Sequence, residues 1–122
     1  MINKVYLLWH TYNTNELLTV ASLTKFDKKY IFKYEEDAIK AIKCGCMVPF
    51  TYTEEEICFD SLPLFFTQRM LSETMLNKLG INYNMNDEFS ILTFNHGRRN
   101  NDNFYVVKEE FYNELKKESK VM

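Results

Sequence analysis

Short apolar runs separated by polar links fill the N-terminal part of the chain. Residues 5–9 form one run, and residues 17–24 form a second that mixes β-branched and apolar side chains. In a third run Tyr30, Phe32 and Tyr34 recur at every second position, the spacing that places side chains on one face of a strand. Three short strands with brief polar links are typical of an antiparallel meander.

The apolar spacing then becomes helical. Three acidic residues at 35–37 precede a stripe with helical steps, and Gly45 stands where a C-terminal cap ends a helix; the stripe consists of Ala38, Ile39, Ala41 and Ile42. The glutamates at 54–56 are typical of a solvated loop. Residues 62–71 indicate a buried helix with Pro63 in its first turn.

Two further short helices and a last strand follow. Ser72 is expected to cap a helix that carries Met75, Leu76 and Leu79 and ends at Gly80. Asn86 is expected to cap a helix over 87–95, which Gly97 ends. Residues 103–107 indicate a final strand, and residues 109–117 a charged terminal helix. The expected core consists of Tyr6, Leu8, Leu23, Phe32, Ile39, Ile42, Phe65, Phe66, Leu76, Phe89 and Leu92.

Length and composition agree with one α+β domain. The chain has 122 residues, of which 46% are hydrophobic and 26% charged, so disordered and rod-like classes are excluded. Fifteen basic and seventeen acidic residues give a net charge of -2, which argues against a nucleic-acid backbone as the main partner. An odd number of cysteines, three, and the lack of a signal-like or membrane-spanning apolar run predict reduced thiols, a cytoplasmic location and no membrane contact.

The sequence offers few groups for catalysis. It has no Gly-rich phosphate loop, and the spacing of Cys44 and Cys46 differs from that of zinc-binding pairs. We therefore predict no catalytic residue, no cofactor and no metal. A small enzyme that uses His96 or a cysteine is a weaker alternative.

Arg98 and Arg99 follow Gly97 in a polar turn and have two interpretations. Their guanidinium groups are suited to a phosphate or to the carboxylates of a partner. Alternatively, arginines at the C-terminal end of a helix pair with its exposed carbonyls and dipole.

Several segments, in this order, resemble the N-terminal subdomain of HipA-type serine/threonine kinases. Residues 20–24 and 29–34 resemble its "G-x-L … Y-x-F-x-Y" opening, and residues 45–50 resemble the Gly- and Pro-containing segment that follows. Residues 62–70 look like its "LFPLFANRL" helix. Residues 88–92 and 97–106 resemble a "D-P-x-x-L-L … G-R-R-x-T-D-x-F-x-V" ending in one branch of these modules.

This resemblance implies a small, curled, barrel-like antiparallel sheet with several short packed helices, over residues 1–107, followed by a charged helix or tail over 108–122. In HipA kinases this subdomain is docked on a separate catalytic core, whose ATP-binding motifs are not found here. A free-standing copy resembles the small HipS subunit of split HipA-like toxin–antitoxin systems. The resemblance therefore implies a non-catalytic antitoxin or regulatory subunit that binds a HipA-like kinase core, with or without a HipB-like DNA-binding protein.

The resemblance also suggests where a partner binds, in the link between the two central helices. The residues expected to contact it are Arg69, Met70, Glu73, Thr74, Arg98 and Arg99. The alternative is that Arg69 and Met70 finish a helix and cover the core. The alternative function is a nucleic-acid-associated accessory protein, suggested by the HIRAN-type domains linked to that branch, although no direct nucleic-acid contact is expected.

Overall fold

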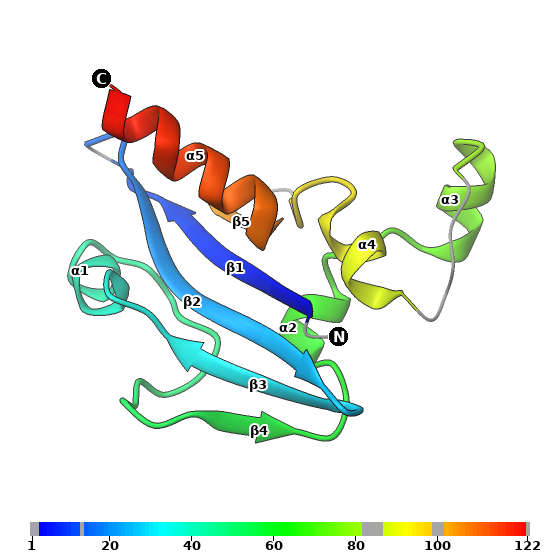
Figure 1. The fold of residues 1–122 in the computed structure, drawn as a ribbon, viewed down its shortest axis with the longest axis horizontal. Helices are drawn as coiled ribbons and strands as arrows, with labels where there is room; N and C mark the ends of the chain where they lie inside the picture. Colours follow the sequence, from blue (N-terminus) through cyan, green and yellow to red (C-terminus); the bar gives the residue numbers. More distant parts are fainter. Residues whose placement is uncertain (1–2, 13, 82–86, 99–101, 122) are drawn as a thin grey trace.

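The structure is a computed structural model that describes residues 3–12, 14–81, 87–98 and 102–121, with side chains in the last helix described up to Lys116. Within these residues, five strands and five helices form one α+β domain (Figure 1). In chain order they are β1 (Asn3–His10), β2 (Leu17–Phe26), β3 (Lys29–Tyr34), α1 (Ala38–Lys43), β4 (Ile57–Phe59), α2 (Leu64–Thr67), α3 (Glu73–Lys78), α4 (Glu88–Thr93), β5 (Phe104–Lys108) and α5 (Glu109–Val121).

The five strands form one antiparallel sheet in the order β4-β3-β2-β1-β5. The expected meander of β1, β2 and β3 is confirmed, and β5 returns to pair with β1. In the described residues β4 and β5 form opposite edges of an open sheet. The barrel-like form expected from the resemblance is therefore wrong, because a barrel requires the two edge strands to pair.

A bulge in β2 preserves the burial of its apolar residues. Leu7 pairs with Ala21, but Leu8 pairs with Thr19, so Val20 is the extra residue on β2. Val20 and Ala21 are both fully buried. The extra residue shifts the alternation by one position, which keeps apolar side chains on the same face along a ten-residue strand.

One face of the sheet, called the core face, packs against α2 and α4. It carries alternate residues of β1, β3 and β5, and these pack with Phe66, Phe89 and Leu92 of the helices. Phe32 has no exposed surface and its ring lies 6.2 Å from that of Phe66, centroid to centroid. The residues of the core face are Val5, Leu7, Trp9, Leu18, Val20, Ala21, Leu23, Tyr30, Phe32, Tyr34, Phe104 and Val106.

The opposite face, called the α5 face, is covered in part by α5, which lies along β1 and β5 (Figure 1). Tyr112 of α5 stacks on Tyr6 with ring centroids 4.0 Å apart, and its hydroxyl is 3.0 Å from that of Thr19. The segment expected to be a charged helix or tail is thus a helix packed on the sheet, and it half-buries Tyr6.

Helix α1 buries its alanines in place of the isoleucines that were expected in the core. Ala38 and Ala41 are fully buried, whereas Ile39 and Ile42, expected in the core, are 49% and 38% exposed. The start of α1 is tied closely to β2, because the Asp37 carboxylate accepts from the Thr19 N–H at 3.0 Å. At so short a distance from the sheet the small alanine side chains fit between the backbones, and the isoleucines point outward.

Other element bounds differ modestly from those expected. Strand β4 was not expected, and the helix expected over 62–71 is limited to α2. The Ser72 cap is confirmed, since its side chain accepts from the Met75 N–H at 3.1 Å. Asp87 caps α4, and the expected cap Asn86 lies outside the described residues. Among the described residues, no helix combines the length and apolar character needed to cross a membrane.

Candidate partner-binding surface

Arg69 occupies the centre of a buried contact between α2 and the segment that leads into β5. Its Nη2 lies 2.5 Å from Oδ2 of Asp102, and its Nη1 donates to Oδ1 of the same carboxylate at 3.2 Å. Nη1 also donates to the carbonyl oxygen of Gly97 at 3.1 Å. The guanidinium carbon lies 4.4 Å and 5.1 Å from the ring centroids of Phe65 and Phe104, so cation–π contacts complete the enclosure.

The segment that receives Arg69 is held by contacts of its own. Gly97 has a φ of +60°, and a Cβ at this position would lie 2.6 Å from Cβ of Val106, so only glycine fits without displacement. The Val106 N–H donates to the His96 carbonyl at 2.7 Å, and the Phe104 N–H donates to Asp102 at 3.2 Å. Several residues of the motif at 97–106 therefore stabilise the fold.

These contacts correct the expected role of Arg69. Its side chain is only 3% exposed and offers no free charge to a partner. Met70 is half-buried and packs against the core. Of the two interpretations of these residues, the one in which they finish a helix and cover the core matches the geometry. The sequence did not reveal this because Asp102 lies 33 positions away and no local pattern links the two.

The other expected residues have different environments. Glu73 and Thr74 are exposed in the first turn of α3. Arg98 is also exposed, and its guanidinium carbon lies 4.4 Å from the ring centroid of Tyr105 on β5. Helix α3 and strand β5 lie apart in Figure 1, so the structure does not gather these residues into one cluster. Arg99 lies outside the described residues.

Helix α3 extends away from the sheet, beyond α4 (Figure 1). Leu76 is its one buried residue, whereas Met75 and Leu79 are 44% and 57% exposed. Met75 and Leu79 are four positions apart and therefore lie on the same side of the helix. Sequence reasoning assigned both to the apolar stripe and missed their exposure. We call Glu73, Thr74, Met75, Lys78 and Leu79 the α3 surface.

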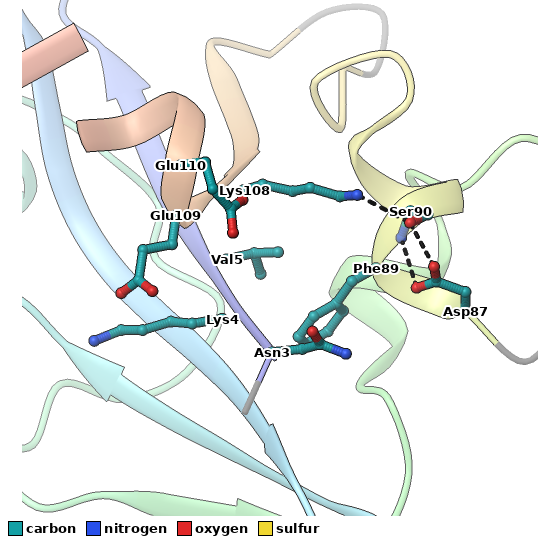
Figure 2. Close-up of a pocket in the computed structure, with 9 residues that line it drawn as sticks. All are labelled: Asn3, Lys4, Val5, Asp87, Phe89, Ser90, Lys108, Glu109 and Glu110. Carbon is teal, nitrogen blue, oxygen red and sulfur yellow. Dashed lines mark hydrogen bonds between the residues drawn. The ribbon is translucent and has the colours of Figure 1, made fainter. Parts of the chain in front are cut away.

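A small polar cleft of about 130 Å³ lies between the starts of β1, α4 and α5 (Figure 2). Lys108 Nζ donates to the Ser90 hydroxyl at 3.0 Å, and this hydroxyl donates to Asp87 at 2.6 Å. The Ser90 N–H also donates to Asp87 at 3.3 Å. A serine beside a lysine is found in some hydrolases. Here Asp87 is the N-cap of α4, so helix capping accounts for both of its bonds to Ser90.

The cysteines differ sharply in burial. Burial raises the pKa of the Cys46 thiol to about 12, so this thiol stays protonated and is a poor nucleophile. Cys44 and Cys58 are free and exposed. Within the described parts of the chain, no group of three or more His, Cys, Asp or Glu side chains is placed to hold a metal ion.

The exposed candidates for partner binding are thus Glu73 and Thr74 on the α3 surface and Arg98 in the turn after Gly97, packed on Tyr105 of β5. The two groups are positioned by different elements, a short capped helix and the tight turn at Gly97. Comparisons of the chain with protein-family models, curated proteins and solved structures found no match.

Proposed function

We propose that this chain is a non-catalytic protein-binding module that binds and restrains a separately encoded HipA-like serine/threonine kinase in the cytoplasm. The observation that carries the binding role is the α3 surface, where Met75 and Leu79 are exposed on a helix that extends from the body of the domain. The class of partner rests on the resemblance of the sequence to the HipA N-terminal subdomain.

The chemistry of the α3 surface suits a protein interface. Interface centres are typically apolar and their rims polar, and methionine adapts its shape to irregular pockets. Met75 and Leu79 supply the apolar centre, and the exposed Glu73, Thr74 and Lys78 supply charged and polar groups around it. Arg98 is a second, separate electrostatic contact in this proposal.

The weak attachment of α3 also supports the proposal. A six-residue helix has little stability by itself in water, and α3 has a single buried side chain, Leu76, to hold it. A partner that covers Met75 and Leu79 provides the apolar packing that this helix lacks on its exposed side. The contacts that bind the partner would then also stabilise α3.

Titration calorimetry against the kinase core encoded by a neighbouring gene tests the proposal. We expect the double variant Met75→Ala/Leu79→Ala to lose about 2 kcal/mol or more of binding free energy, about a thirtyfold weaker complex, with an unchanged circular dichroism spectrum. Ile39→Ala, at an exposed position of α1, is the matched control and should bind like wild type. A double variant that binds as tightly as wild type would contradict the assigned surface.

A kinase assay distinguishes restraint from simple association. Adding the chain to the kinase core should lower its phosphorylation of a protein substrate, and the double variant should require a higher concentration for the same effect. If the chain instead binds duplex DNA with a steep dependence on salt and does not bind the kinase, the nucleic-acid alternative is correct.

A further inference from the structure

A groove lies between α5 and the α5 face of the sheet, on residues to which the proposed function assigns no role. Its floor contains Leu8 and Val107, each only 2% exposed, from the neighbouring strands β1 and β5. Phe111 and Leu115 of α5, four positions apart on one side of the helix, form its wall. The surface lining the groove is almost wholly apolar.

The groove exists because α5 covers only part of this face. Tyr112 holds the helix to the sheet through its stacking on Tyr6 and its hydroxyl contact with Thr19. On the other side of α5, Phe111 is 44% exposed and packs against His96, with ring centroids 4.9 Å apart. The helix is thus fixed along one side and leaves open apolar surface along the other.

Two imidazole side chains and a neighbouring guanidinium accompany the apolar lining of the groove. The imidazoles of His10 and His96 line it, and the guanidinium of Arg98 packs on the ring of Tyr105, another lining residue. None of the lining residues that the structure describes is acidic. An apolar channel with donors and a fixed positive charge beside it is complementary to an apolar molecule that carries a carboxylate.

The size of the groove limits the ligand. Its volume is about 260 Å³, below the roughly 300–1,000 Å³ of pockets that take drug-sized molecules. Since a water molecule takes up about 30 Å³ of liquid, the groove holds a chain of roughly eight to ten non-hydrogen atoms.

We propose that this groove binds a small amphiphilic carboxylate, whose hydrocarbon chain of about eight carbons lies on Leu8 and Val107 against α5, and whose carboxylate is held beside Arg98 and His96. The groove and the α3 surface share no residue, but Arg98 also belongs to the second contact of the proposed function. Met75→Ala/Leu79→Ala, and not Arg98→Ala, therefore separates kinase binding from binding in the groove.

Titration of the full chain with sodium octanoate, followed by amide chemical shifts in two-dimensional NMR, tests the proposal. We expect saturable shifts at β1, β5 and the first turns of α5, with a Kd of about 1–10 mM. Hexanoate should bind about fifteenfold more weakly, at about fourfold per methylene group. Octanol, which lacks the charge, and octylammonium, which reverses it, should both bind more weakly than octanoate.

Three variants separate the parts of the site. Phe111→Ala should weaken octanoate and octanol equally, whereas Arg98→Ala should weaken octanoate and leave octanol unchanged. Phe26→Ala is the matched control, since Phe26 is 57% exposed and does not line the groove, and should change neither. The absence of saturable shifts up to about 50 mM octanoate, or equal affinity for octanoate and octylammonium, would overturn the proposal. So would self-association of the wild-type chain, in sedimentation, that Phe111→Ala abolishes.

Discussion

Two consecutive segments, residues 64–70 and residues 73–79, have opposite relations to the body of the domain. The first buries Phe66 and the charged Arg69, whereas the second exposes Met75 and Leu79. Polarity alone predicts the reverse for Arg69, Met75 and Leu79. What decides burial is the partner that the tertiary structure provides: Arg69 meets Asp102 and two aromatic rings, whereas Leu79 meets solvent on the outer side of α3.

The charge of Arg69 is tolerated inside the domain because it is compensated. A paired carboxylate, a carbonyl oxygen and two ring faces replace much of the water that the guanidinium loses, whereas its buried Nε has no hydrogen-bond partner among the described residues. Replacing both charged groups of such a contact by apolar side chains changes the free energy of unfolding little. Removing one of them costs far more, because the other charge is left unpaired. The segment at 64–70 is therefore expected to be sensitive to substitution, and the α3 surface tolerant.

The largest effect is expected at Arg69. Arg69→Ala leaves Asp102 without its charge partner and should lower the free energy of unfolding by about 3–5 kcal/mol, measured by urea denaturation. Arg98→Ala, which removes an exposed arginine from the ring of Tyr105, is the matched control and should cost less than about 1 kcal/mol. If the two variants lost equal free energy of unfolding, the buried contact of Arg69 would contribute no more than an exposed one.

A second large effect is expected at Gly97, which packs beneath the same contact. Gly97→Ala combines a positive φ with a Cβ only 2.6 Å from Val106 and should cost about 2–4 kcal/mol in the same measurement. Gly80→Ala at the end of α3 has a similar φ, +68°, but no atom of the described residues lies within 4 Å of the new Cβ. It should cost about 1 kcal/mol from backbone strain alone. A similar loss of stability at both positions would show that Val106 moves away from the new Cβ without cost.

An effect confined to alkaline pH, of at most about 1.4 kcal/mol per pH unit, is expected from the buried thiol. The pKa of Cys46 is about 12 in the folded chain and 9.0 when unperturbed, so above pH 9 the unfolded state releases a proton that the native state keeps. The free energy of unfolding should therefore fall as the pH rises from 9 to 12. Burial raises the pKa of Tyr34 as well, which acts in the same direction above pH 10.

Chemical denaturation at several alkaline pH values measures this decline, and Cys46→Ala should reduce it. Cys58→Ala, at an exposed cysteine, is the control and should leave the slope unchanged. In the native state iodoacetamide should modify Cys44 and Cys58 and spare Cys46, as read by mass spectrometry. Native-state modification of Cys46 at the rate of Cys58 would contradict its burial.

The smallest effect on stability is expected on the α3 surface. Met75→Ala/Leu79→Ala removes side chains that already contact solvent and should change the free energy of unfolding by less than about 0.5 kcal/mol. The same double variant is the one expected to weaken the kinase complex, so an unchanged stability also validates the binding measurement. A loss of 2 kcal/mol or more would mean that these side chains are core residues.

The sequence predicted elements and buried residues correctly where burial follows from local spacing. The three N-terminal strands, the final strand, the Ser72 cap and the burial of Phe89 and Leu92 in α4 were predicted from periodicity and capping residues alone, whereas the burial of Ile91 was not. The core residues Leu8, Leu23, Phe32, Phe66, Leu76, Phe89 and Leu92 are confirmed as buried.

The sequence did not predict burial where it depends on a residue that is distant in the chain. The isoleucines of α1 are exposed because Asp37 ties that helix close to β2, and the burial of Arg69 depends on Asp102. The openness of the sheet and the short edge strand β4 are set by tertiary pairing as well. Among the candidate site residues that the structure describes, Glu73, Thr74 and Arg98 are exposed, whereas Arg69 is buried and Met70 half-buried.

Amide hydrogen exchange tests the contrast between the two segments most directly, because it measures local opening along the whole chain at once. The Val106 and Phe104 N–H groups, which close the contact around Arg69, should exchange only with global unfolding. The Leu79 N–H, bonded to Met75 within α3, should exchange at least a hundredfold faster, about 2.7 kcal/mol or more below the global free energy. Equal protection of the two segments would contradict the view that one stabilises the fold and the other is an attached, accessible surface.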